Sequence, residues 1–427
     1  MTTAPAPHFP VVVVGGGQAG LAMSRELSVR GIAHVVFEKH RVGHAWRTQR
    51  WDSFCLVTPN WQCLLPGFAY AGADPHGFMP RDEIVAYVES YARHIEAPVR
   101  EGVAVTRIAP APGGFALETS EGAVTADAVV LAVGGYHRPN IPRSAERLPT
   151  GILQVHSSAY RNAESLPEGA VVVVGSGQSG CQIAEDLHLA GRAVHLVTGS
   201  APRCPRVYRG RDAVDWLADL GQYELPVERH PLGAGVRRKA NHYLTGRGGG
   251  RDIDLRRFAA EGMRLYGRLD GVDPGGAMRF RADLAANLDG ADAVYNGICE
   301  LIDRHIAEAG IDAPPGGRYA PVWQPAADQP QDLDVAASGV SAVVWATGFI
   351  SDWSFVDLPL FDGSGYPRHQ RGVTAVPGVY VLGLPWLHTW GSGRFVGVGR
   401  DADYLGDAVA AHLAAQLGTD EPVRRSA

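Results

Sequence analysis

Two stretches of this chain repeat one pattern, in which four successive valines pass directly into a glycine-rich turn. Residues 11–14 lead into Gly15-Gly16-Gly17-Gln18-Ala19-Gly20, and residues 171–174 lead into Gly175-Ser176-Gly177-Gln178-Ser179-Gly180. An uninterrupted valine run is typical of a strand buried on both faces of a parallel sheet. The spacing GxGxxG after such a strand is typical of a turn into a dinucleotide-binding helix. The repeat therefore predicts two dinucleotide-binding units in one α/β chain.

The first unit has every part of a dinucleotide site. Gly15 permits the tight turn, Gly17 lets the backbone approach a pyrophosphate, and Gly20 lets the following helix pack on its strand. A second strand is expected at residues 34–37 and ends at Glu38, eighteen residues after Gly20. An acid in that place accepts hydrogen bonds from an adenosine ribose, so we predict that FAD binds here.

The second unit ends without an acid. Its second strand, expected at residues 193–197, is followed by Thr198. A carboxylate there would repel a 2′-phosphate, whereas a threonine with Ser200 and Arg203 just beyond it favours NADPH over NADH. The alternative for Arg203 is a solvated loop charge.

Composition excludes several other classes of protein. A chain of 427 residues suits two domains, and a net charge of −6 gives no basic surplus for nucleic acid or an anionic membrane. No signal-peptide pattern and no apolar stretch of membrane-spanning length is evident, so we expect a cytoplasmic protein. The five cysteines form neither a CxxC pair nor a metal-ligand set. A disulfide reductase is therefore not expected, although Cys55 and Cys63 could be redox-active if the fold brought them together.

A tryptophan-rich loop follows the first unit. Trp46, Trp51 and Trp61 occur within sixteen residues, mixed with arginines and proline, which suits a loop that lines a planar ligand. The alternative is that these rings fill a core. Asn60 and Gln62 are the polar residues here best suited to hold a flavin edge or a substrate.

Further along, the pattern predicts a helix at 81–95, strands at 103–108, 115–119 and 128–133, and a linker at 136–149. Residues 204–319 are interpreted as a helical excursion of the second domain, with helices at 253–265, 282–288 and 293–309, and its glycine-arginine loop 246–251 could act as a lid. A strand ends in Ala346-Thr347-Gly348, and another at 379–382 ends at Gly383. The last helix is expected to begin near Gly399, where its positive N-terminus would suit a reduced flavin.

Several of these features together resemble the class B flavin monooxygenases, which include the flavin-containing, plant indole-pyruvate and Baeyer–Villiger enzymes. They are the paired GxGxxG motifs, Trp46-Arg47, His156-Ser157-Ser158-Ala159-Tyr160 and Ala346-Thr347-Gly348. The resemblance covers nearly the whole chain. It is closest to a bacterial branch of FAD-dependent oxidoreductases associated with nitrilase gene clusters, chiefly through residues 50–62 and 388–395.

The resemblance implies a monooxygenase that uses FAD, NADPH and O₂. In that family NADPH reduces the flavin, a flavin C4a-hydroperoxide forms, and retained NADP⁺ shields it until a small organic substrate takes one oxygen atom by N- or S-oxygenation or a Baeyer–Villiger reaction. The family's fingerprint is altered here, because Gly151 precedes His156 by five residues and no phenylalanine leads it. His156 and Tyr160 are carried over as linker residues near the nicotinamide, and the alternative for His156 is a hydrogen-bonded structural histidine.

We therefore predict an α/β fold with two Rossmann-like dinucleotide-binding domains. The FAD-binding domain comprises residues 1–165 and 339–427, and the NADPH-binding domain at 166–338 is inserted into it. Asn60 and His156 are the catalytic candidates. The predicted cofactor-binding residues are Gly15, Gly17, Gln18, Ala19, Gly20, Glu38, Lys39, Trp46, Arg47, Thr58, Asn60, Gln62, Val105, Gly134, Gly175, Gly177, Gln178, Ser179, Gly180, Thr198, Ser200, Arg203, Thr347, Gly348, Gly383, His388 and Thr389.

The expected partners are a small-molecule substrate and O₂, with a homodimer left open. Two other functions stay open. One is an NADPH-dependent flavin reductase or oxidase that does not oxygenate a substrate, and the other is a non-catalytic flavin-binding sensor.

Overall fold

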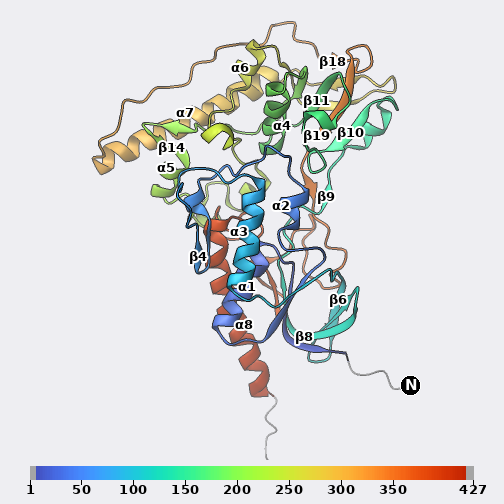
Figure 1. Ribbon diagram of the computed structural model, residues 1–427, viewed down its shortest axis with the longest axis vertical. Coiled ribbons are helices and arrows are strands. Elements are labelled where there is room, and N and C mark those ends of the chain that lie inside the picture. Colours follow the sequence, from blue (N-terminus) through green and yellow to red (C-terminus); the bar gives the residue numbers. More distant parts are fainter. Residues whose placement is uncertain (1–5, 420–427) are drawn as a thin grey trace, which may run out of the picture.

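The computed structural model describes residues 6–419 and has two lobes, each built around a mainly parallel sheet (Figure 1). In the first lobe the parallel strands run in the order β23-β8-β1-β2-β5. Their bounds are β1 His8–Val14, β2 His34–Glu38, β5 Val99–Glu101, β8 Gly122–Leu131 and β23 Val379–Val381. The valines of β1 are almost completely buried, as expected for a central strand.

Antiparallel strands join this sheet at two places. The hairpin of β6 and β7 pairs with β8, and β21 and β22 extend the β23 edge. Their bounds are β6 Val105–Ala111, β7 Gly114–Thr119, β21 His369–Gln370 and β22 Val373–Thr374. The small meander predicted from residues 103–133 is confirmed.

Helices cover the first sheet. α1 (Gln18–Val29) packs beside α8 (Phe395–Thr419), and Arg30 at the end of α1 pairs with Asp403 and Asp407 of α8. α3 (Arg81–His94) has the predicted apolar face, and α2 (His44–Thr48) is a single short segment. α8 begins four residues earlier than expected, because Phe395 and Val398 are buried and join its apolar face.

The second sheet is wholly parallel, in the order β10-β19-β11-β12-β15. The bounds are β10 Leu153–His156, β11 Ala170–Val174, β12 Val194–Val197, β15 Arg264–Tyr266 and β19 Val340–Trp345. α4 (Gln178–Leu189) follows β11. β1 pairs with β2 and β11 pairs with β12 in the same register, since Val11 lies opposite His34 and Val171 opposite Val194. The two predicted units are therefore structural copies.

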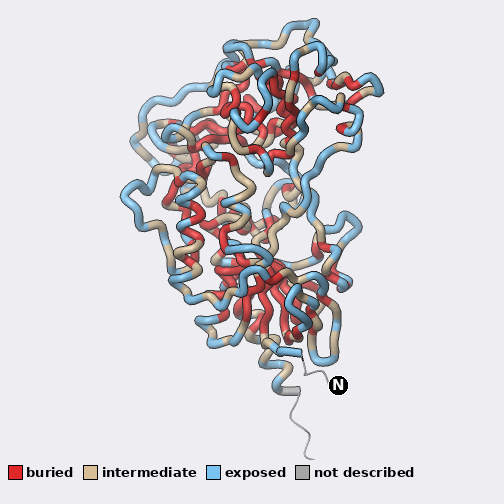
Figure 2. Tube along the Cα trace, turned by 45° about the vertical axis from the view of Figure 1, so that its right-hand side comes forward, coloured by how far each residue is buried: buried red, intermediate tan, exposed pale blue. Residues whose placement is uncertain are grey.

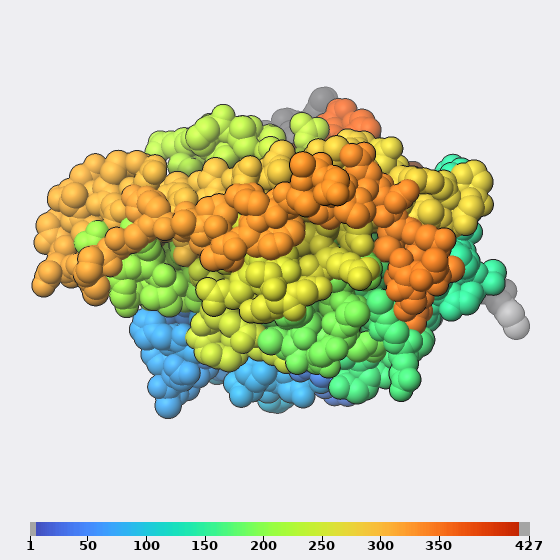
Figure 3. Space-filling model, turned by 90° about the horizontal axis from the view of Figure 1, so that it is seen from above, coloured from blue at the N-terminus to red at the C-terminus, as the bar shows by residue number. Residues whose placement is uncertain are grey.

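The excursion covers the second lobe and reaches over the first. In Figure 3 its later part forms a band across the top of the molecule. It contains α5 Ala213–Asp219, α6 Leu255–Ala260, α7 Leu284–Ala309, β16 Leu269–Val272 and β17 Met278–Phe280. β18 (Asp332–Leu333), which follows the excursion in the chain, pairs with β17.

Two helix predictions in the excursion are wrong. The helix expected at 253–265 ends at Ala260, because residues 264–266 pair with β12 as β15. The helices expected at 282–288 and 293–309 are one helix, since Leu288 and Ala291 are buried on either side of Gly290 and the packed face continues through it.

The chain crosses between the lobes twice, and the two crossings pair with each other. β9 (Arg138–Pro139) lies antiparallel to β20 (Phe349–Ile350). Figure 2 shows a separate buried centre in each lobe. The boundaries predicted at 165 and 339 are wrong for two strands. β19 pairs with β11 and β10 pairs with β19, so both strands belong to the second sheet. No described helix is long and apolar enough to cross a bilayer.

Candidate functional site: two glycine turns at the lobe junction

Close backbone contacts shape the first glycine turn. Gly15 has a φ of +107°, and a Cβ there would lie 2.6 Å from the carbonyl oxygen of Ala132. A Cβ on Gly20 would lie 1.8 Å from the carbonyl oxygen of Gly15. Gly17 differs, because its φ is −78° and nothing lies within 4 Å of its Cβ position. The turn is thus closed underneath and open at Gly17, where a pyrophosphate can approach the first N–H groups of α1.

The second turn has the same geometry. Gly175 also has a φ of +107° and would place a Cβ 2.6 Å from the carbonyl oxygen of Ala346. A Cβ on Gly180 would lie 1.8 Å from the Gly175 carbonyl oxygen, and Gly177 is again open. Both turns therefore fit a dinucleotide, and each lies beside the segment that leads to a crossing between the lobes.

The strand ends beside the two turns differ. The Glu38 carboxylate accepts hydrogen bonds from the backbone N–H groups of Gly16 (2.8 Å) and His40 (2.9 Å), which fixes it at the end of β2. In the second unit the Thr198 hydroxyl donates to the Tyr266 carbonyl (2.8 Å) and lies 3.3 Å from Asn287 Nδ2. Glu38 is therefore placed for a ribose, whereas buried Thr198 has its hydroxyl committed within its own domain. Ser200 is exposed in the following loop.

Arg203 does not face a nucleotide. Its side chain is buried, pairs with Asp292 at 2.9 Å, and lies 3.7 Å from Asp254 and 3.9 Å from Asp252. Its guanidinium also stacks on Tyr319 at 4.1 Å. The prediction that Arg203 holds the 2′-phosphate is wrong, because these internal carboxylates already use its charge.

The glutamine that follows each central glycine anchors a distant segment. Gln18 Nε2 donates to the Gly393 carbonyl (3.2 Å), and its Oε1 accepts from Trp46 Nε1 (3.3 Å). Gln178 bonds the backbone N–H and carbonyl of Leu244 in the excursion. The side chains of Gln18 and Gln178 thus hold the walls of the two turns.

The three tryptophans of the loop have different environments. Trp46 is half-buried and stacks on Phe395, with ring centroids 5.9 Å apart. Trp51 is buried in the core of the second lobe, as in the alternative interpretation. Trp61 donates to Asp215 (2.7 Å) and lines an open cleft of about 710 Å³ between the loop and α5. Of the three, Trp46 is the one that bonds a residue of the first turn, Gln18.

Asn60 and Gln62 are both buried, but their contacts differ. Asn60 Nδ2 donates to the Asp74 carbonyl (2.9 Å), and its Oδ1 accepts from the Met79 N–H (2.7 Å). These bonds give Asn60 a structural role and lend no support to a catalytic one. The buried carboxamide of Gln62 interacts with the Tyr223 hydroxyl, and its oxygen has no hydrogen-bond partner among the described residues. Gln62 therefore remains a candidate for a ligand contact.

His156 lies at the end of β10, where the lobes meet. Its Nε2 lies 2.9 Å from the Gly348 carbonyl and its Nδ1 2.9 Å from the Ser158 hydroxyl. Burial lowers its pKa from the ordinary value. Because both ring nitrogens are engaged, the geometry favours the structural alternative. Tyr160 donates to Asp186 (2.6 Å), which gives it a similar structural role.

The segment before α8 closes one side of the first turn. Gly383 approaches Ala19 so closely that a Cβ would lie 2.5 Å from the Ala19 Cβ. The backbone N–H groups of His388 and Thr389 both donate to the Ser392 hydroxyl (3.0 and 2.9 Å). His388 and Thr389 are therefore placed beside the turn, in a loop held by Ser392.

The remaining predicted residues take several positions. Arg47 pairs with Glu89 of α3 (2.5 Å), so its charge is already used. Thr347 donates to the Asn140 carbonyl at the crossing. Lys39 and Gly348 are exposed, and Thr58, Val105, Gly134 and Ser179 are half-buried.

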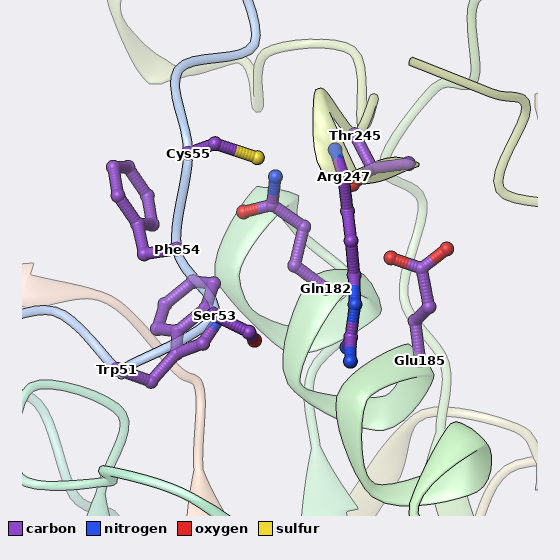
Figure 4. Close-up of a pocket in the computed structure, with 8 residues that line it drawn as sticks. All are labelled: Trp51, Ser53, Phe54, Cys55, Gln182, Glu185, Thr245 and Arg247. Carbon is purple, nitrogen blue, oxygen red and sulfur yellow. Dashed lines mark hydrogen bonds between the residues drawn. The ribbon is translucent and has the colours of Figure 1, made fainter. Parts of the chain in front are cut away.

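Residues that no sequence motif singles out hold the lobe junction together. Asp186 of α4 accepts from Ser53 (2.6 Å), Tyr160 (2.6 Å) and Arg247 (2.6 Å), which come from three separate segments. Figure 4 shows Ser53 and Arg247 at a small cavity of about 10 Å³ between the tryptophan loop and α4. The Ser53 bond thus ties the tryptophan loop to α4 of the second lobe, and loop 246–251 is fixed at the same carboxylate. A buried polar residue in the middle of an apolar helix is the one signal that could have pointed to Asp186.

All five cysteines are buried and none forms a disulfide. Burial raises the pKa of Cys55 to about 11 and that of Cys63 to about 12. Neutral buried thiols are poor nucleophiles, so the structure offers no dithiol centre for disulfide reduction.

Comparison with known proteins agrees with this geometry. Residues 12–209 match a family described as pyridine nucleotide-disulphide oxidoreductase. A flavin-containing monooxygenase from Stenotrophomonas maltophilia has a similar structure, with a TM-score of 0.66 and 20% identity over 95% of this chain and 99% of that one. Bacillithiol disulfide reductase from Bacillus cereus shares the fold at a TM-score of 0.60 and 16% identity, over 96% of this chain and 99% of that one.

Sequence relatives are closer. An oxidoreductase from Geobacillus kaustophilus described as CzcO-like is 33% identical over 94% of this chain and 98% of its own length. The indole-3-pyruvate monooxygenase YUCCA4 of Oryza sativa is 32% identical over 47% of this chain and 49% of its own length. The chain belongs to the CzcO-like oxidoreductases, within the class B flavin-dependent monooxygenases.

Proposed function

We propose that the protein is an FAD- and NADPH-dependent monooxygenase that transfers one atom of O₂ to a small organic substrate. The observation that carries this is the pair of glycine turns with one geometry, each next to a crossing between the lobes. Two dinucleotides bound at these turns would extend toward one junction. The family's flavin and nicotinamide cofactors suit this arrangement.

The residues of the chain would bind, orient and shield the cofactors. Glu38 would accept the ribose of FAD, and the N–H groups after Gly17 and Gly177 would meet the two pyrophosphates. Bound flavin supplies the redox chemistry and the activation of O₂. Trp46, residues 388–394 and the excursion would exclude water from that chemistry.

The choice of NADPH rests on the neutral end of β12. Glu38 lies at the end of β2, whereas Thr198 follows β12, so this strand places no carboxylate to repel a 2′-phosphate. With Arg203 committed elsewhere, exposed Ser200 is the predicted phosphate contact that remains.

The experiment that tests this proposal measures how much oxygenated product and how much H₂O₂ form for each NADPH consumed. Purified protein should be yellow with FAD, and NADPH consumed with a suitable amine, thioether, ketone or oxo acid should appear as singly oxygenated product labelled from heavy-isotope O₂. One H₂O₂ per NADPH with every substrate would instead identify an NADPH oxidase. Protein that retains no flavin, or does not oxidise NADPH, would contradict both.

A further inference from the structure

Arg394 lies one residue before α8, between the first glycine turn and the excursion. The carbonyl of the preceding residue, Gly393, accepts from Gln18, and the ring of the next residue, Phe395, stacks on Trp46. The two chain neighbours of Arg394 thus contact Gln18 of the first turn and Trp46, which bonds Gln18. Arg394 is therefore held on the side of the turn where the flavin of the proposed enzyme would lie.

Beside Arg394 stands an aromatic cluster, which we define as Tyr223, Trp386 and Trp390. Tyr223 and Trp390 are nearly parallel with ring centroids 4.6 Å apart, and Trp386 is 6.4 Å from Trp390. The Arg394 guanidinium lies 4.6 Å from the Trp390 ring. Asn241 Oδ1 accepts from Trp390 Nε1 (3.0 Å) and from Arg394 (3.4 Å).

The aromatic cluster and its two polar neighbours, Asn241 and Arg394, come from both lobes. Tyr223 and Asn241 belong to the excursion, whereas Trp386, Trp390 and Arg394 precede α8. The excursion is fixed here by the Val227 N–H, which donates to the His388 carbonyl (2.7 Å), and by Arg237, which donates to the Trp386 carbonyl (3.0 Å). These bonds make the excursion a wall of the first site.

Arg394 has no counter-ion among the described residues. The nearby carboxylates are used elsewhere, since Glu224 pairs with Arg400 (2.8 Å) and Glu228 lies 3.9 Å from His388. Burial and the charge of Arg394 lower the pKa of His242 to about 4, and burial raises that of Tyr223 to about 12. The charges beside the aromatic cluster are therefore positive, from Arg394 and from Arg237, which donates to the Trp386 carbonyl.

A second observation also indicates a missing ligand. The buried carboxamide of Gln62 interacts with the Tyr223 hydroxyl, and its oxygen has no hydrogen-bond partner among the described residues. Buried polar groups are usually hydrogen-bonded, and a half-buried guanidinium is usually paired. Here a buried amide with an unpaired oxygen, a cation without a counter-ion among the described residues and flat aromatic rings occur together.

We propose that this cluster binds a substrate with a planar aromatic group and a carboxylate. The carboxylate pairs with Arg394, the ring packs against Trp390 and Trp386, and Gln62 supplies a further polar contact. The proposal rests on the proposed function only in taking the first turn as the flavin site. It assigns the excursion a role in substrate selection.

The test measures binding to the flavin-loaded full-length protein without NADPH, so it does not depend on oxygenation. The probes are two matched pairs of acid and amide, phenylacetate with phenylacetamide and naphthoate with naphthamide. Their binding is measured by quenching of tryptophan fluorescence and by flavin difference spectra. The intact protein should bind each acid about tenfold or more tightly than its amide, as a charge-assisted contact allows. Arg394→Gln should remove this preference, and Arg394→Lys should restore part of it.

Arg400→Gln is the matched control, because Arg400 is six residues away and already paired with Glu224. It should leave the preference unchanged. Equal binding of acid and amide by the intact protein, or an unchanged preference in folded Arg394→Gln, would overturn the proposal. Loss of flavin from folded Arg394→Gln would also overturn it and make Arg394 a cofactor contact. Absence of oxygenated product alongside a clear acid preference would instead count against the proposed function alone.

Discussion

At the residue scale, Arg203 shows how a side chain with the right charge can be taken out of a site. It pairs with Asp292, which also pairs with Arg256 (2.8 Å), so two arginines and one aspartate are buried together. Arg206 and Arg209, the other cations in this stretch, pair with Asp212 (2.8 Å) and Asp303 (2.8 Å). The arginines of residues 203–209 thus form internal ion pairs that stabilise this part of the fold, and their charges are not available to bind a phosphate.

Arg203→Ala should therefore destabilise the protein and leave nucleotide preference unchanged. Removing one partner of a buried ion pair costs roughly 3–5 kcal/mol. Urea unfolding measures that loss, and the ratio of kcat/KM for NADPH to that for NADH measures preference. Arg281→Ala, which removes an exposed pair with Asp270, should change stability by less than about 1 kcal/mol. A lost NADPH preference with unchanged stability would return Arg203 to the phosphate site.

At the scale of elements, the glycine turns separate packing from ligand binding. Gly17 and Gly177 are the open positions, whereas Gly20 is closed by the Gly15 carbonyl. Gly17→Ala should fold normally and weaken FAD retention by roughly tenfold, about 1.4 kcal/mol, because its methyl group stands where the pyrophosphate approaches. Gly177→Ala should weaken nicotinamide nucleotide binding and leave flavin content intact.

Gly20→Ala is the contrasting variant. Its Cβ would overlap the carbonyl group of Gly15 in the turn, so stability should fall by at least about 1–3 kcal/mol. Flavin content, nucleotide affinity and thermal unfolding measured on the three variants separate the two roles. Equal flavin loss in Gly17→Ala and Gly177→Ala would contradict the assignment of one dinucleotide to each turn.

At the scale of the whole molecule, buried neutral histidines should make the fold sensitive to acid. Burial, with a contribution from Arg264, lowers the pKa of His195 to about 4, and burial with Arg237 does the same for His369. An unfolded imidazole takes up its proton near its ordinary pKa of about 6.5, so stability is full above that pH and falls as pH drops toward 4. The loss is at most about 1.4 kcal/mol per pH unit for each histidine, and water access reduces it.

Denaturant unfolding at pH 7 and pH 5 should show the lower stability at pH 5. His195→Phe should flatten this dependence by removing one of the titrating groups. Asp401 acts in the opposite direction, because burial raises its pKa and its protonation favours the folded state. Equal stability at the two pH values would show that these histidines accept protons without unfolding.

Local physics in the sequence determined the two α/β units. Valine runs specify strands buried on both faces. Glycine is the residue that fits a φ of +107°, and it also fits where a Cβ would lie 1.8 Å from a carbonyl oxygen. Each unit is a contiguous stretch, so its register and turn follow from neighbouring residues. The α/β fold and the family could therefore be predicted without the structure.

Only the tertiary structure decided the features that depend on pairing between residues far apart in the chain. β10 and β19 join the second sheet through partners that are distant in the chain, which moved the domain boundaries. Arg203 lost its phosphate role to carboxylates about 50 to 90 residues away. Arg394 lies on Trp390, is bonded by Asn241 of the excursion, and has no counter-ion in the part of the chain that the structure describes. A charge in a sequence has no fixed partner, and the packing of distant segments determines whether it is neutralised or left for a ligand.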